Sequence, residues 1–314
     1  YLMFKSILGT ALTRFLNAIF TLLILVVNAN SFGKEGMGTI GLLVLGITLI
    51  LLLSNYIGGG ALVYLSPRID IFKLFFPSYV WAGISSVLGA ILLSFFHLIP
   101  VEFTFDVLFL ALLQAFISTN QNILLGKQKI LWFNMVTIVQ VGLTLSALLV
   151  FIYVVDIKDV TAYIYALYLA YLAAFLLSLS LIYKYIHFSD ITEIGPVLSK
   201  IFRYGKFIQT ANVLQLLNYR LSFYIIEFFI GRAALGLYNT ATQLSEGVWL
   251  IGKSVAMIQY SSISNSDDKD YARRLSLRLL KFTFVFTLLI LFVLLIIPSD
   301  WYSLVFSADF RQLK

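Results

Sequence analysis

The sequence has no cysteine and only two histidines, His97 and His187. Without cysteine the chain forms no disulfide bond and offers no thiolate as nucleophile or metal ligand, and two histidines are too few for a histidine-based metal site. Charged residues are also scarce, at 12% of the 314 residues, where a soluble domain carries about 25%. These shortages exclude a soluble enzyme, a nucleic-acid-binding domain and a disordered chain, and we expect neither metal nor cofactor.

Apolar residues, by contrast, make up 61% of the chain and are arranged in long runs. A membrane-spanning helix needs about 20 mostly apolar residues. The five prolines fall between these runs or at their ends, so no proline kink is expected within a helix. The pattern predicts an all-α polytopic membrane protein of about nine transmembrane helices, at residues 6–28, 37–57, 74–98, 107–125, 130–154, 161–184, 207–230, 235–258 and 279–298.

The distribution of lysine and arginine predicts the orientation of these helices. With a cytoplasmic N-terminus, 14 of the 22 basic residues lie in cytoplasmic segments and five in outer loops, as the positive-inside rule requires. The longest internal connection carries charges, Gly195 and Pro196, and is typical of a linker between two halves. We therefore expect a six-helix N-terminal lobe at 1–186, a cytoplasmic linker at 187–206 and a C-terminal lobe at 207–314.

Two short segments with a common pattern indicate an internal repeat. Residues 33–38 (GKEGMG) and 231–236 (GRAALG) both fit Gly-basic-x-x-(Met/Leu)-Gly, and both follow a helix that carries an arginine, Arg14 or Arg220. The offset of 198 residues equals six helices, and such repeats are a common way to build a transporter around a central path. Nine helices make one and a half units, so we expect the second lobe to be incomplete here, with three or more helices beyond Lys314.

Polar residues form stripes on several predicted helices, most clearly the first, seventh and eighth. Because polar groups that face lipid are costly, these stripes should turn inward. Arg220 and Glu246 each lie about 21 Å from the same membrane surface at 1.5 Å per residue, so adjacent helices would place them opposite one another. Buried ionised groups mark either a charge pair or a function. The sequence therefore leaves two interpretations of Arg220 and Glu246, a structural salt bridge and a functional site. Three embedded cations, Arg14, Arg220 and Lys253, give the path a basic bias that suits an anionic substrate.

The residues from Leu217 to Ser264 resemble the helix 7–8 region of bacterial polysaccharide-repeat flippases, the O-antigen and capsule exporters of the multidrug/oligosaccharidyl-lipid/polysaccharide exporter (MOP) superfamily. Gly236-Leu237-Tyr238 followed by Ala241 is similar to the family's G-x-Y-x-x-A, and Arg220 stands where such proteins often have a basic residue. The stretch through residues 33–36, the glycines at 58–60 and Arg68 resembles the family's opening pair of helices. Ser222 departs from the family, which frequently has an aspartate there, and the family usually has twelve to fourteen helices.

The resemblance implies a two-lobed transporter of six-helix repeats that flips an undecaprenyl-pyrophosphate-linked oligosaccharide from the inner to the outer leaflet by alternating access. It serves O-antigen (lipopolysaccharide), capsule or exopolysaccharide biosynthesis in the bacterial cytoplasmic (inner) membrane. Membrane lipid and the polysaccharide polymerase machinery are further expected partners, and nucleic acid is not. The resemblance implies no catalytic residue, a coupling or charge-pair role for Glu246, and substrate contacts from Arg14, Asn17, Gln215, Asn218, Arg220 and Lys253.

Three alternatives remain at this stage. A multidrug or cation exporter of the same superfamily would prefer acidic residues in the first six helices, which carry none. A peptidoglycan-precursor flippase fits as well, because its substrate also carries pyrophosphate. A membrane glycosyltransferase or polymerase would need a carboxylate pair or a large outer loop; Asp268-Lys269-Asp270 spells Asp-x-Asp but lies in a charged run typical of a solvated loop.

Overall fold

The structure, a computed structural model, describes residues 2–186, 194–264 and 269–313, without the side chains of residues 2–12 and of most residues from 248 to 264. Over these residues it contains helices and no strand, which confirms the predicted all-α fold. The α-helices are α1 (Leu2–Gly58), α2 (Gly60–Leu65), α3 (Ile71–Phe95), α4 (Thr104–Gly126), α5 (Ile130–Tyr153), α6 (Thr161–Tyr183), α7 (Ile194–Phe229), α8 (Arg232–Ser264), α9 (Lys269–Ile296) and α10 (Ser299–Phe306), with short 3-10 helices η1 (Val101–Phe103) and η3 (Ala308–Leu313).

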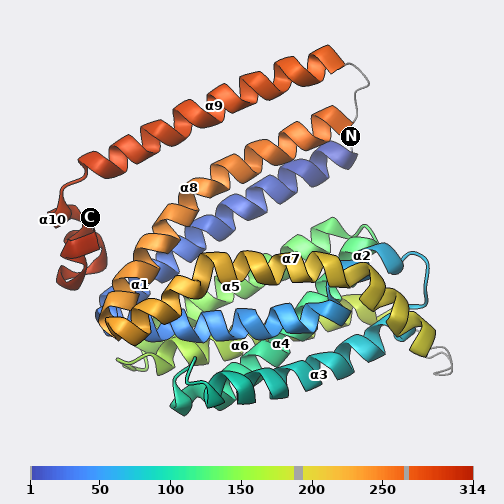
Figure 1. Cartoon of the computed structure of the whole chain (residues 1–314), viewed down its shortest axis with the longest axis horizontal. Coiled ribbons are helices and arrows are strands. Elements are labelled where there is room, and N and C mark those ends of the chain that lie inside the picture. The colour runs from blue at the N-terminus through green and yellow to red at the C-terminus, as the bar shows by residue number, and fades with distance from the viewer. Residues whose placement is uncertain (1, 187–193, 265–268, 314) are drawn as a thin grey trace.

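Helix α1 contains the first two predicted spans as two arms. The arms meet at Gly33, whose φ of 61° and ψ of −168° are not helical. A positive φ is costly for any residue with a Cβ, so glycine permits the reversal. Figure 1 shows the first arm running from the N-terminus to this break and the second arm running back beside α7.

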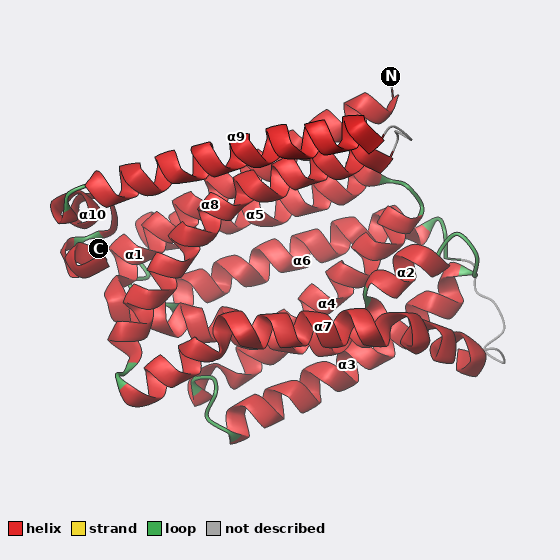
Figure 2. Ribbon diagram, turned by 45° about the horizontal axis from the view of Figure 1, so that its top comes forward, coloured by secondary structure: helices red, strands yellow, loops and turns green. Residues whose placement is uncertain are grey.

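The two arms of α1 organise the rest of the bundle. Helix α1 contacts α3, α4, α5, α7 and α8, and α5 packs along α6. Figures 1 and 2 show α8 and α9 along one side of the molecule, with α3 and α7 along the other. The helix ends near Gly33 are called the Gly33 end below, and the opposite end, where α1 stops and α3 and α7 begin, is called the basic end.

The outward surface of the bundle is apolar, as a lipid environment requires. Large hydrophobic side chains are exposed along the outer helices, among them Ile91 on α3 and Leu176 on α6. Six stretches of the described residues are long and apolar enough to cross a membrane, the first of which includes both arms of α1. Helix α7 is not among these six, because polar and ionised residues lower its hydropathy. The chain is therefore a multi-pass membrane protein.

Two local features differ from the sequence expectations. Pro77 lies in the second turn of α3, so the expectation that every proline falls in a loop or at a helix end is wrong at this position. Proline at this position removes one backbone hydrogen bond, the one to the carbonyl oxygen of Lys73. Residues 194–206, assigned to the linker, form the first turns of α7, whereas residues 187–193 lie outside the described part of the chain.

The two glycine hexamers of the predicted repeat pack directly against each other. A Cβ atom at Gly38 would overlap the carbonyl oxygen of Arg232, and a Cβ atom at Gly236 would overlap the carbonyl oxygen of Lys34. Lys34 and Arg232 occupy equivalent places in the two hexamers, as do Gly38 and Gly236, so the contact is reciprocal. Gly231, the equivalent of Gly33, also has a positive φ, of 104°. A local pseudo-two-fold axis thus relates α1 and α8 at their crossing.

This crossing predicts which glycines of α8 accept a side chain. We expect Gly236→Ala to destabilise the protein by about 1–3 kcal/mol, because the new methyl group must displace backbone rather than a flexible side chain. Thermal unfolding of the purified protein in detergent measures the effect.

Gly247→Ala is the matched control on the same helix, because a Cβ there meets no described atom within 4 Å. This variant should be neutral or slightly stabilising, since alanine is the better helix former. Equal melting temperatures for the two variants would contradict a tight backbone crossing.

Candidate functional site

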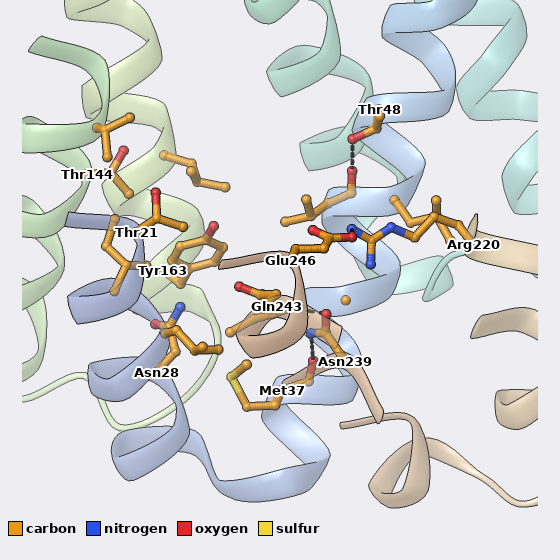
Figure 3. A pocket seen from close by; sticks show the side chains of 18 of the residues that line it. Thr21, Asn28, Met37, Thr48, Thr144, Tyr163, Arg220, Asn239, Gln243 and Glu246 are labelled. Atoms are coloured by element: carbon orange, nitrogen blue, oxygen red, sulfur yellow. Dashed lines mark hydrogen bonds and ion pairs between the residues drawn. The ribbon is translucent and has the colours of Figure 1, made fainter. Parts of the chain in front are cut away.

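A cavity of about 350 Å³ lies where both arms of α1 meet α5, α6, α7 and α8. Its lining is mixed, with polar groups set among aliphatic and aromatic side chains (Figure 3). The polar and aromatic lining residues are Thr21, Asn28, Thr48, Gln140, Thr144, Tyr163, Tyr171, Arg220, Phe223, Asn239, Gln243 and Glu246.

An ion pair forms the charged wall of the cavity. The Nη2 atom of Arg220 on α7 lies 2.6 Å from the Oε1 atom of Glu246 on α8, and the guanidinium also lies 4.9 Å from the ring centre of Phe223. Their side chains are 21% and 37% exposed, so the pair is partly open to the cavity. Among the cavity-lining residues that the structure describes, these two are the only ionised groups.

Helix α8 adds two amides to the same wall. The Nδ2 atom of Asn239 donates to the carbonyl oxygen of Met37 at 3.0 Å, and Gln243 donates to the Oδ1 atom of Asn239 at 3.1 Å. Asn239, Gln243 and Glu246 are spaced by four and three residues, so they share one helix face. These hydrogen bonds link the charged wall to the second arm of α1 beside the glycine crossing.

The opposite wall is polar but neutral. It consists of Thr21 and Asn28 from the first arm of α1, with Thr144 from α5 and Tyr163 from α6 (Figure 3). Asn28 is 2% exposed, and its Oδ1 atom has no hydrogen-bond partner among the described residues. A buried amide oxygen without a partner is costly, so it offers an acceptor to a hydroxyl or to water in the cavity.

The residues that the sequence analysis singled out occupy different places. Arg220 and Glu246 come together in the cavity, as their equal depth predicted. The cavity lining does not include the other four candidates whose side chains are described, of which Asn17 is half-buried and Arg14, Gln215 and Asn218 are exposed. Lys253 lies on α8, but its side chain is outside the described part of the structure.

The site candidates did not include several lining residues. Asn239 and Gln243 could have been added from their spacing to Glu246 on one helix face. Tyr163 and Tyr171 carry no such signal, because they stand in an apolar, aromatic-rich helix. The polar stripes of α4 and α5 mainly join the two helices to each other: Gln140 donates to Gln114 at 2.7 Å and Gln121 to Thr137 at 2.9 Å.

Comparisons with known proteins agree with this architecture. The family model described as "Polysaccharide biosynthesis protein" matches residues 72–313, whereas no curated protein matches the chain. The inward-facing conformation of a multidrug resistance MATE family transporter of the MOP superfamily has a TM-score of 0.71 at 16% identity, and the match covers 94% of this chain and 75% of that one. The structure of the MATE multidrug transporter DinF-BH has a TM-score of 0.63 at 18% identity, covering 97% of this chain and 74% of that one.

The helical architecture around a central cavity is thus the fold of a multi-pass membrane protein that is similar to these two transporters. Within this class, the chain belongs to the polysaccharide biosynthesis protein family, whose model spans most of its length. The resemblance to the superfamily's polysaccharide flippases is thereby confirmed. The two solved structures named above are transporters by their descriptions.

A cysteine-free chain permits a direct test that the cavity holds water. We expect Thr48→Cys, in the cavity lining, to react with a membrane-impermeant maleimide about tenfold faster than Ile91→Cys on the lipid-facing side of α3, because a thiol reacts as the thiolate, which needs water. Mass spectrometry of the protein labelled in open membrane fragments measures both rates. Equal slow labelling would show that the cavity is dry.

Proposed function

We propose that the protein flips an undecaprenyl-pyrophosphate-linked oligosaccharide from the inner to the outer leaflet of the bacterial cytoplasmic membrane by alternating access. The observation that supports this most strongly is the Arg220–Glu246 pair in a polar cavity of a polysaccharide biosynthesis family member. No chemical step is required, so the protein acts as a transporter and not as an enzyme. The product would serve O-antigen, capsule or exopolysaccharide assembly, with the polymerase machinery downstream.

In this proposal, Arg220 exchanges one anionic partner for another. Its planar guanidinium can donate two parallel hydrogen bonds to phosphate oxygens, as it does to a carboxylate. When the pyrophosphate binds Arg220, the carboxylate of Glu246 is released and takes up a proton or another cation, because an uncompensated charge at this depth is costly. Substrate binding and cation binding are therefore coupled through one ion pair.

The neutral wall of the cavity supports the carbohydrate part of the proposal. Sugar hydroxyls both donate and accept hydrogen bonds, and the amide, hydroxyl and phenol groups of Asn28, Thr144 and Tyr163 offer both functions. Arg14, Asn17, Gln215, Asn218 and Lys253 remain predicted substrate contacts for other stages of the transport cycle.

The proposed orientation places the basic end in the cytoplasm. Arg68, Lys127, Lys129 and Lys184 lie in or beside the connections at that end, and the positive-inside rule assigns such connections to the cytoplasm. The N-terminus is then cytoplasmic, and the glycine crossing lies toward the outer face.

A multidrug or cation exporter is the second candidate, because the similar solved structures are multidrug transporters. In that case Glu246 would bind the cationic substrate. A peptidoglycan-precursor flippase, whose substrate also carries pyrophosphate, is a further alternative within the superfamily. A cation would have to displace Arg220 from its carboxylate, just as pyrophosphate would have to displace the carboxylate from Arg220. Membership of the polysaccharide biosynthesis protein family is what favours the oligosaccharide lipid.

Complementation of bacteria that lack their own repeat-unit flippase tests the proposed function. We expect the wild-type protein to restore surface polysaccharide, and Arg220→Ala to lose at least about 90% of it at normal membrane levels, because the pyrophosphate contact is gone. The measurement is surface polymer per unit of membrane-inserted protein. If the wild type fails across several repeat-unit chemistries but lowers the accumulation of a cationic dye, the exporter function holds instead.

Two further variants separate a substrate contact from a structural salt bridge. Removal of one partner of a buried pair costs about 3–5 kcal/mol, whereas removal of both is much less costly. The double variant Arg220→Ala/Glu246→Ala should therefore reach normal membrane levels and still fail to export polymer. Polymer export by this double variant would show that the pair is structural. Arg311→Ala/Asp300→Ala is the matched control, because it removes an exposed Arg–Asp pair outside the cavity lining.

A further inference from the structure

A second concave site lies at the basic end, separate from the central cavity. It is a groove of about 480 Å³ between the end of α1, the middle of α3 and the first turns of α7, lined by Tyr56, Ile57, Trp81, Gly195, Leu198, Ser199 and Phe202. The rings of Tyr56 and Phe202 stack at 6.3 Å, and the Trp81 indole donates to the carbonyl oxygen of Leu53 at 3.0 Å. The groove shares no residue with the central cavity.

The first turns of α7 form one side of the groove and are amphipathic. Figure 1 shows them turning away from the remainder of α7 toward the start of α3. Val197 and Ile201 are buried in one cluster with Ile71 and Leu74, whereas Lys200 and Arg203 are exposed. Helix α7 has 36 residues and is therefore about 54 Å long at 1.5 Å per residue. It is longer than the ~30 Å hydrocarbon layer, so its first turns reach the membrane surface.

Positive charge borders the groove on this helix. Arg203 follows Ser199 by four residues and Lys206 follows Phe202 by four, so both extend the helix face that lines the groove. The described residues 194–206 contain no acid that would neutralise them. An apolar slot beside cations at the membrane surface matches the chemistry of an anionic lipid, whose acyl chain is apolar and whose phosphate is negative.

We propose that this groove binds an anionic phospholipid of the leaflet at the basic end. One acyl chain lies against Tyr56, Trp81 and Phe202, and the phosphate lies on the cations of Arg203 and Lys206. The bound lipid fastens the first turns of α7 to the ends of α1 and α3. This site is independent of the transported substrate, and it holds whether the cavity carries an oligosaccharide lipid or a drug.

Quenching of Trp81 by brominated lipids tests the proposal without any transport assay. The 314 residues carry four tryptophans, so a Trp132→Phe/Trp249→Phe/Trp301→Phe background leaves Trp81 as the single tryptophan among them. We expect phosphatidylglycerol with brominated acyl chains to half-quench Trp81 in vesicles at a mole fraction about tenfold lower than equally brominated phosphatidylcholine. Each cation near the headgroup contributes at most about a fivefold preference, so two cations set an upper limit of about 25-fold, which salt screening lowers.

Charge variants in the same single-tryptophan protein test whether the cations of α7 cause the preference for phosphatidylglycerol over phosphatidylcholine. The preference for phosphatidylglycerol should disappear in the triple variant Lys200→Gln/Arg203→Gln/Lys206→Gln. The preference should remain in the matched triple variant of α9, Arg273→Gln/Arg278→Gln/Lys281→Gln, which removes three exposed cations there. Ser199→Phe, which narrows the groove from a partly open position, provides a second variant if the charge triple does not fold. It should raise the half-quenching mole fraction of the brominated phosphatidylglycerol.

Three outcomes would overturn the proposal. The first is equal quenching by the two brominated lipids, and the second is a preference that survives the α7 triple variant. The third is displacement of the brominated lipid by an isoprenoid phosphate at ratios where unbrominated phosphatidylglycerol has no effect. This last result would assign the groove to the carrier lipid of the substrate.

Discussion

The direct backbone contact between the two glycine hexamers is the constraint on which the central site depends. Because Gly38 and Gly236 have no side chain, α1 and α8 cross with their backbones closer than any pair of larger residues would permit. The crossing places Asn239 against the carbonyl oxygen of Met37 and fixes the register of α8 along α1. Glu246, two turns further along α8, then reaches Arg220. A short stretch of glycine therefore determines where an ionised group stands within the membrane.

The ion pair also has an energetic consequence for transport. Within a membrane protein a charge is tolerated when it is paired, and the loss of one partner leaves the other charge uncompensated. Because this pair is partly open to the cavity, the cost is below the about 3–5 kcal/mol of a fully buried pair. A ligand that takes Arg220 away from Glu246 must offset this cost, either by its own hydrogen bonds or by delivery of a cation to the carboxylate. In the proposed function, the pair would act as a threshold against weakly charged molecules, and pyrophosphate would supply several oxygens for the exchange.

The repeat is symmetric in its backbone and asymmetric in its side chains. Equivalent positions, 198 residues apart, pair Gly41 with Asn239 and Thr48 with Glu246, and all four residues line the cavity. The N-terminal member of each pair is small or neutral, whereas the C-terminal member is larger and more polar. At these two positions the first fold unit therefore supplies small or neutral side chains, and its copy supplies the amide and the carboxylate of the charged wall.

The sequence by itself determined the class of the protein and much of its layout. Its scarcity of charge, its apolar runs and the matching hexamers predicted an all-helical membrane protein with an internal repeat, because hydrophobic length and glycine placement act locally along the chain. The equal depth of Arg220 and Glu246 was also a property of position within single helices. The sequence could not show that Gly33 joins two arms within one helix or that the linker residues 194–206 continue α7. Nor could it show that Tyr163 and Asn28 face the ion pair across a cavity. These features depend on which helices lie side by side, and side-by-side packing is decided by contacts between residues far apart in the chain.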